Sequence, residues 1–155
     1  SVTHSKEGLA TLLDFSKMSI ESFRMPDDWR FKLVDTGIRR SLSETNYSSS
    51  EIKIETRRIH AKEESARVRA ALTSDARVLG TILNESHASI SDNIRASTPE
   101  IDNMVKEIQS TAGVLGARLM GGGFGGMILA LVEEEDTLPG ELLVSSAPAF
   151  LQETL

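Results

Sequence analysis

The chain has 155 residues, a formal net charge of −6 at pH 7 and a pI near 5.1. This length suits one domain with a substantial core, and the acidic balance argues against a nucleic-acid partner, which would require a basic face. The absence of cysteine excludes disulfides and zinc–thiolate sites and suits a cytoplasmic protein. The three histidines lie far apart and the longest apolar run is about six residues, so we expect no metal site and no membrane span.

The chain opens at Ser1 without an initiator methionine or an apolar leader, and we expect it to be a piece of a longer protein. An apolar run predicts a short strand over residues 9–15. Pro26 begins a turn, and the alternating residues 30–35 after it are typical of a half-buried strand.

Three helices are predicted next. Asn46 is a candidate cap for a helix over residues 48–72, whose two apolar rows, Ile52/Ile59/Ala66 and Ile54/Ala61/Val68, predict neighbours on two sides. Asp75 caps a second helix, with one apolar face formed by Leu79, Leu83, Ser86, Ile90 and Ile94. The third begins at Thr98 with a proline in its first turn, buries Ile101, Val105 and Ile108, and ends by Gly113.

Strands over residues 114–119 and 127–132 follow, with a short one over residues 142–145 near the end. The order of elements predicts an α+β fold: a small, mostly antiparallel sheet with helices packed on one side.

Five of the eleven glycines lie in one window of six residues, here called the glycine loop: Gly121, Gly122, Gly123, Phe124, Gly125 and Gly126. Glycine is costly to order, so such a cluster indicates positive φ angles or close approach of the backbone to another group. Successive N–H groups that bind a phosphate are one interpretation, and a mobile turn between two strands is the other.

Two known phosphate-binding motifs do not fit this loop. Gly121, Gly123 and Gly126 have the spacing of the dinucleotide-binding motif, but no room remains for the helix and strand that must follow it. A P-loop requires Lys-Ser/Thr where Met127 and Ile128 stand.

Residues 116–126, Gly-Ala-Arg-Leu-Met-Gly-Gly-Gly-Phe-Gly-Gly, resemble the third motif of galactokinases. These enzymes belong to the galactokinase, homoserine, mevalonate and phosphomevalonate (GHMP) kinase superfamily. Residues 85–87 with 97–102 are similar to the helix pair before that motif, and residues 34–38 with Tyr47 to the sugar-holding segment. Residues 8–26 resemble the last stretch of the N-terminal lobe.

The resemblance implies a C-terminal domain over residues 26–155, after the truncated end of an N-terminal lobe in residues 1–25. It implies transfer of the γ-phosphate of MgATP to the anomeric hydroxyl of galactose or a related sugar. The six residues of the glycine loop would lie near phosphate and sugar, and Tyr47 would donate to a sugar hydroxyl. The family's catalytic groups would lie before Ser1, in the protein's own N-terminal lobe, so we expect the isolated chain to be inactive.

Individual residues leave alternatives open. Asp35 is a sugar-hydroxyl acceptor or a turn cap, and Arg118 is the basic residue retained as a candidate on the phosphate side. His87 is interpreted as a hydrogen-bonded structural histidine, and the serines at 48–50 as the first turn of a helix.

The sequence also departs from the family. Met120 stands where galactokinases commonly have threonine, Met127 where they commonly have cysteine, and Ser48-Ser49-Ser50-Glu51 replaces the usual continuation after the tyrosine. A non-catalytic protein that binds sugar and nucleotide is therefore a rival hypothesis. A fragment stable only through a partner lobe or a self-dimer is a third.

Overall fold

The computed structural model describes residues 7–39 and 54–144. The chain divides into two compact units, one up to Trp29 and from Leu143 onward, the other Arg30–Leu142. The assignment of residues 1–25 to an N-terminal lobe and 26–155 to a C-terminal domain stays a prediction. Tyr47, the Asn46 cap and the serines at 48–50 lie outside the described residues.

The first unit contains a β-hairpin. Strand β1 (Leu9–Asp14) pairs antiparallel with β2 (Ser19–Arg24), from Leu9↔Arg24 to Asp14↔Ser19. The sequence predicted β1 but not β2, in which only Ile20 and Phe23 are apolar. The turn between them has no glycine or proline: Asp14 Oδ1 accepts from the N–H groups of Ser16 and Lys17 at 3.0 and 3.2 Å.

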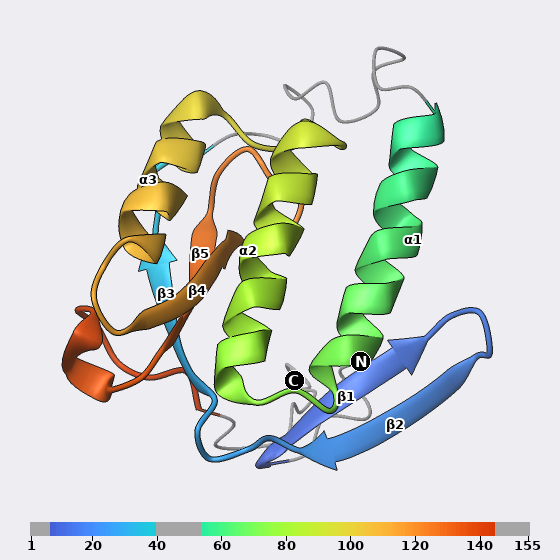
Figure 1. Cartoon of the computed structure of the whole chain (residues 1–155), viewed down its shortest axis with the longest axis horizontal. Helices are drawn as coiled ribbons and strands as arrows, with labels where there is room; N and C mark the ends of the chain where they lie inside the picture. Colours follow the sequence, from blue (N-terminus) through green and yellow to red (C-terminus); the bar gives the residue numbers. More distant parts are fainter. Residues whose placement is uncertain (1–6, 40–53, 145–155) are drawn as a thin grey trace, which may run out of the picture. The chain divides into compact units, whose positions relative to one another are not determined.

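The second unit is built on a three-stranded sheet with the order β3-β5-β4 (Figure 1). Strands β3 (Arg30–Asp35), β4 (Val114–Leu119) and β5 (Met127–Val132) have the predicted bounds. Both pairings are antiparallel, and β5 is the central strand because β3 and β4 each pair with it.

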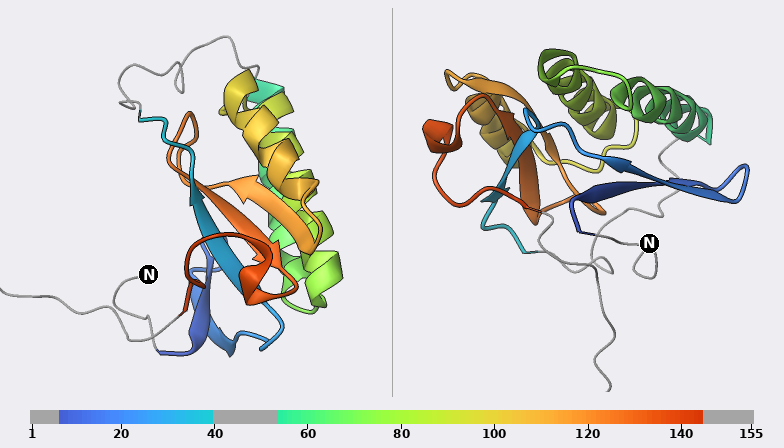
Figure 2. Two further views of the ribbon diagram at one scale, coloured as in Figure 1. Left: turned by 90° about the vertical axis from the view of Figure 1, so that its left-hand side faces the viewer. Right: turned by 90° about the horizontal axis from the view of Figure 1, so that it is seen from below.

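Three helices, α1 (Ile54–Ala71), α2 (Ala76–Asp92) and α3 (Pro99–Gln109), lie on one side of this sheet (Figure 2). The predicted caps are present: Asp75 accepts from the N–H of Val78 at 2.8 Å, and Thr98 from that of Ile101 at 3.3 Å. The structure confirms the α+β fold with a small antiparallel sheet and helices on one side.

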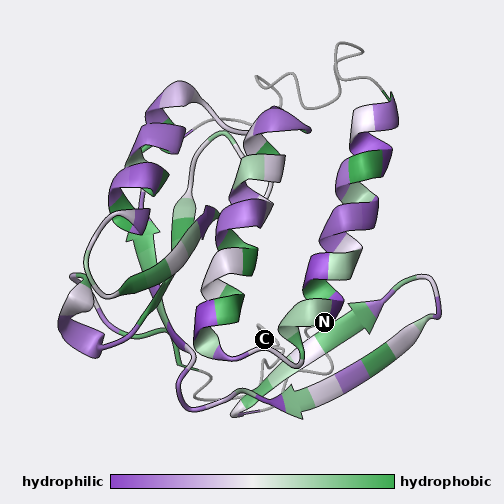
Figure 3. Cartoon of the chain, viewed as in Figure 1, coloured by the Kyte–Doolittle hydropathy of each residue, from purple (hydrophilic) through white to green (hydrophobic). Residues whose placement is uncertain are grey.

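The core of the second unit lies between α3 and the sheet. Its buried members are Ile101, Val105, Ala117, Leu119, Ile128 and Ala130. The hydrophobic residues of α2 and α3 face the strands, and their hydrophilic residues face away (Figure 3). Helix α2 crosses β4 at very short range, because a Cβ built on Gly80 would lie 2.2 Å from the carbonyl oxygen of Leu115.

Helix α1 contradicts the prediction that its apolar rows contact neighbours on two sides. None of its residues is buried, and Ile54, Ile59 and Val68 are 78%, 40% and 42% exposed. The half-buried side of α1 is instead mostly polar; its members, here called the α1 seam, are Thr56, His60, Glu64, Arg67 and Ala71. These positions recur at intervals of three or four residues, so they form one stripe along the helix.

The predicted last strand is reduced, among the described residues, to a single bridge between Lys32 and Leu142. A short 3₁₀ helix, η4 (Glu135–Thr137), precedes it. Lys32 is 2% exposed, and its ammonium donates to the carbonyl oxygens of Leu138 at 2.9 Å and of Gly140. A buried lysine thus ties this segment to β3. In the described part of the chain, no helix combines the length and apolarity needed to cross a membrane.

Candidate functional site

The glycine loop joins β4 to β5 and is held by backbone hydrogen bonds on two sides. The N–H of Phe124 donates to the carbonyl of Ala96 at 2.8 Å, and the N–H of Gly126 to that of Ile38 at 3.1 Å. The Gly126 carbonyl accepts from the N–H and the hydroxyl of Thr36 at 2.9 and 2.8 Å. Segments from before α1 and between α2 and α3 therefore fix the shape of the loop.

Positive φ angles and close backbone contacts within the chain both account for glycines of the loop. The φ angles of Gly121, Gly123, Phe124, Gly125 and Gly126 are all positive, which favours residues without a Cβ. At Gly123 a Cβ would lie 2.2 Å from the Ala96 oxygen, and at Gly125 2.5 Å from the Ile38 oxygen. At these two positions the group that leaves no room for a side chain is the chain's own backbone. Two N–H groups of the loop are also used within the protein.

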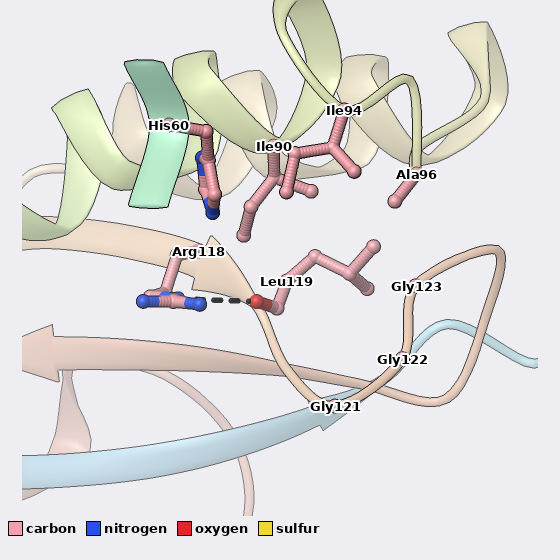
Figure 4. A pocket seen from close by; sticks show the side chains of 9 residues that line it. All are labelled: His60, Ile90, Ile94, Ala96, Arg118, Leu119, Gly121, Gly122 and Gly123. Atoms are coloured by element: carbon pink, nitrogen blue, oxygen red, sulfur yellow. Dashed lines mark hydrogen bonds between the residues drawn. The ribbon is translucent and has the colours of Figure 1, made fainter. Parts of the chain in front are cut away.

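A cavity of about 130 Å³ lies on the inner side of the loop (Figure 4). The loop contributes Gly121, Gly122 and Gly123, and an apolar wall faces them from α2 and the connection to α3; the other residues are Ile90, Ile94, Ala96, Leu119, His60 and Arg118. The polar side chains His60 and Arg118 come from α1 and β4, so the cavity joins distant parts of the chain.

Arg118 lines the cavity, but its guanidinium is engaged by the protein. Its Nη1 donates to Glu64 Oε1 at 2.6 Å, and its Nε to the Leu119 carbonyl at 3.2 Å. The head group extends away from the three glycines (Figure 4).

His60 is a cavity residue that the sequence analysis did not identify. Its Nδ1 lies 2.9 Å from Ser89 Oγ, and the free end of its ring points into the cavity (Figure 4). Burial lowers the pKa of His60, with Arg67 and Arg118 acting in the same direction and Glu64 against it, so His60 is neutral at pH 7. The only signal in the sequence was its position four residues before Glu64, which is informative once the polar side of α1 is known to face inward.

Asp35, the second candidate for the sugar, is bound by its own turn. Its carboxylate accepts from Arg39 at 2.5 and 2.7 Å and from the N–H of Gly37 at 2.9 Å. The hydrogen bond from Arg39 is the main reason that the pKa of Asp35 falls from 3.8 to about 2. This geometry favours the turn-cap interpretation, and a sugar contact stays a proposal, as does that of Tyr47.

His87 has the surroundings of a structural residue. It is 7% exposed on α2, and its Nδ1 accepts from the N–H of Leu119 at 3.4 Å. Its Nε2 lies 3.3 Å from Asp102 Oδ1, but the angles between the two groups are not those of a hydrogen bond. Burial lowers the pKa of His87, although the nearby Asp102 acts against this.

The residues within 7–39 and 54–144 include no group of three or more His, Asp or Glu side chains placed to hold a metal ion. The cavity lining also contains no carboxylate. The arrangement can therefore hold a small molecule against glycine backbone, an apolar wall and two nitrogen-bearing side chains.

Residues 68–139 match the sequence model of the family described as "GHMP kinases C terminal". The match includes α2, α3, both strands around the glycine loop and the loop itself. The chain thus contains a GHMP kinase C-terminal domain. Its relatives within that superfamily include galactokinases.

A galactokinase of Streptomyces coelicolor is 49% identical over 72 residues, which are 46% of this chain and 18% of the relative. A galactokinase of Thermococcus kodakarensis is 30% identical over an alignment of 164 residues, covering 86% of this chain and 47% of the relative. The chain thus spans less than half the length of these relatives.

Solved structures share the fold. A galactokinase of Lactococcus lactis, complexed with galactose, superposes with a TM-score of 0.63 at 22% identity, covering 93% of this chain and 52% of that one. A mevalonate kinase of Methanococcus jannaschii gives 0.60 at 21% identity, covering 76% and 39%. At these identities the likeness concerns the fold alone.

Proposed function

We propose that this chain is the C-terminal domain of a galactokinase-like sugar kinase. The full-length protein transfers the γ-phosphate of MgATP to the anomeric hydroxyl of galactose or a related sugar, and its own N-terminal lobe completes the site. The observation that carries the proposal is a galactokinase-type glycine loop folded against a cavity with two nitrogen-bearing side chains. The cytoplasm is the proposed location.

The loop contributes a surface on which phosphate and sugar lie closely against backbone. Phosphoryl transfer depends mainly on positioning and on stabilising the charge of the moving group, and both require a rigid wall. Backbone hydrogen bonds from Phe124 and Gly126 supply that rigidity. In this proposal Tyr47 contacts the sugar, and Arg118 lies on the phosphate side.

The chain alone is inactive in this proposal, because the catalytic groups belong to the N-terminal lobe and no carboxylate from residues 7–39 or 54–144 lines the cavity. A coupled assay of ADP release with galactose and MgATP tests this directly. We expect turnover by the full-length protein and none by residues 1–155. Multiple turnovers by the shorter chain would contradict the division of roles.

The loop is tested by Gly121→Val in the full-length protein. Gly121 lines the cavity, and no described atom lies within 4 Å of a Cβ built there, although its φ of 71° strains any side chain at this position. We expect MgATP or galactose affinity to fall at least tenfold, since the ligand loses its close approach to backbone. Gly140→Ala is the control, because Gly140 also has a positive φ but lies outside the loop. Unchanged affinities and turnover in Gly121→Val would remove the role of the loop.

The departures from the galactokinase pattern at Met120 and after Tyr47 favour a second candidate, a non-catalytic regulatory protein that binds sugar and nucleotide on the same fold. Binding of both ligands by the full-length protein without any ADP release would identify it.

A further inference from the structure

Arg118, which lines the cavity, is paired with a carboxylate from another element, α1. Glu64, in the α1 seam, accepts from Arg118 of β4 at 2.6 Å, from the hydroxyl of Ser86 in α2 at 2.5 Å and from Arg67 at 3.1 Å. Donors from three elements thus meet on one side chain that is only 20% exposed.

Glu64 is ionised despite its burial. Burial alone would raise its pKa, but the hydrogen bond from Ser86, the charge of Arg118 and the hydrogen bonds from Arg67 and Arg118 outweigh it, and the pKa lies below its usual value. Arg118 is therefore paired with a negative charge that lies outside the cavity lining and is shared with Arg67.

This pairing conflicts with a simple role for Arg118 in binding phosphate. A guanidinium that reaches the cavity but extends away from the glycines (Figure 4) is not poised for an anion on the loop. Carboxylate and phosphoryl oxygens are recognised by the same donors of an arginine, so the two compete for it.

We propose that Glu64 is a positioning residue that holds Arg118 away from the glycine loop and competes for it with a phosphoryl group bound in the cavity. This inference rests on the proposed function, because it assumes that a phosphorylated ligand binds there. The ligand draws Arg118 toward the loop and weakens its pair with Glu64. The affinity of the cavity for the phosphoryl group is therefore lower than it would be if Arg118 had no carboxylate partner.

The test is Glu64→Gln in the full-length protein, with MgADP affinity measured by calorimetry. The amide is close in size to the carboxylate and still accepts from Ser86, but it no longer neutralises Arg118. We expect MgADP to bind roughly tenfold more tightly. In an Arg118→Met background the same change should have no effect on affinity. If Glu64 has only a structural role, Glu64→Gln should lower the thermal stability of the protein and should not tighten MgADP binding.

Glu63→Gln is the matched control. Glu63 is the neighbouring residue and binds Arg67 at 3.1 Å, as Glu64 does. Its substitution should leave MgADP affinity unchanged, and an equal gain there would reduce the effect to net charge and overturn the inference. If Glu64→Gln does not fold, Glu64→Asp shortens the side chain while keeping the charge, and it should also release Arg118 and tighten binding.

The outcomes separate the two proposals. If MgADP binds the wild type and Gly121→Val weakens it, but neither Glu64 variant tightens it, the inference on Glu64 is wrong and the proposed function stands. If the full-length wild type does not bind MgADP, the proposed function fails, and the inference fails with it.

Discussion

At the scale of single residues, the glycine loop shows that the same sequence signal has two different physical causes. All four of Gly121, Gly123, Gly125 and Gly126 have positive φ. At Gly123 and Gly125 a backbone carbonyl of the protein also leaves no room for a Cβ, whereas at Gly121 and Gly126 no described atom lies within 4 Å of an added Cβ. The loop therefore offers matched positions at which the steric and the conformational contributions can be separated.

We expect Gly123→Ala to destabilise the protein more than Gly121→Ala. Both substitutions place a Cβ at a positive φ, which costs about 1 kcal/mol. Only Gly123→Ala also drives the Cβ against the Ala96 oxygen, and the shift this requires should add about 2 kcal/mol. Urea unfolding of the two variants measures the difference. Equal losses would mean that the loop moves freely away from the segment between α2 and α3.

The sequence predicted some residue-level features and not others, for local reasons. The caps at Asp75 and Thr98 were predictable because each signal lies within four residues of the groups it satisfies. The pairing of Arg118 with Glu64 was not, since 54 positions separate the two residues. Only the packing of α1 beside α2 brings them together.

At the scale of elements, α1 and α2 contact each other through different chemistry from that of α2 and the sheet. The α1 seam meets α2 through hydrogen bonds and ion pairs, including Glu64 with Ser86 and His60 with Ser89. The spacing of apolar residues predicted that the wrong side of α1 faces the interior, because that method takes apolar side chains to be the ones that contact neighbouring elements. The same assumption was right for α2 and α3, whose buried residues include Leu79, Leu83, Ile101 and Val105.

The crossing of α2 over β4 gives a prediction in which packing opposes helix propensity. In a helix alanine is favoured over glycine by about 1 kcal/mol, so Gly80→Ala would be stabilising on that basis alone. Its Cβ would lie 2.2 Å from the Leu115 oxygen, so we expect a net loss of about 2 kcal/mol instead.

Ala88→Gly is the control for this prediction. Ala88 is exposed on the same helix, and its replacement should lose about 1 kcal/mol through propensity alone. Thermal or urea unfolding compares the two variants. A stabilised Gly80→Ala protein would show that α2 and β4 are not in such close contact.

At the scale of the whole molecule, the strands and helices of the second unit were largely predictable, while the hairpin and the end of the chain were less so. Strong apolar runs defined β4 and β5. Strand β2 has a weak alternation and a turn without glycine or proline, and residues 142–144 depend on the distant Lys32 for their single bridge. The cavity was not predictable, since three segments that are far apart in the sequence line it: His60, residues 90–96 and residues 118–123.

The stability of the folded chain should depend on pH through its partly buried histidines. The pKa values of His60 and His87 are both lowered, mainly by burial, so the unfolded chain binds more protons than the folded one. Their contribution is present above the unfolded pKa, near 6.5, and is lost as the pH falls through the lower folded values. Glu64 and Asp35, whose pKa values are also lowered, add to this only in more acidic solution, below their ordinary pKa values of 4.5 and 3.8.

We therefore expect the free energy of unfolding to be nearly constant between about pH 7 and 8 and to decrease from about pH 6.5 downward. Urea titrations at several pH values measure it. The double variant His60→Gln/His87→Gln should show a flatter profile over the same range. A wild-type profile that rises on acidification would contradict the direction of both pKa shifts.

The backbone anchors of the glycine loop have a consequence for how changes elsewhere reach it. The carbonyl groups of Ala96 and Ile38 accept hydrogen bonds from the loop and fix its curvature in the folded chain, before any substrate binds. A binding partner meets a surface that is already shaped and spends little entropy on ordering it. Substitutions near residues 38 and 96, which need never touch a ligand, can thus alter the loop as effectively as changes to its own glycines.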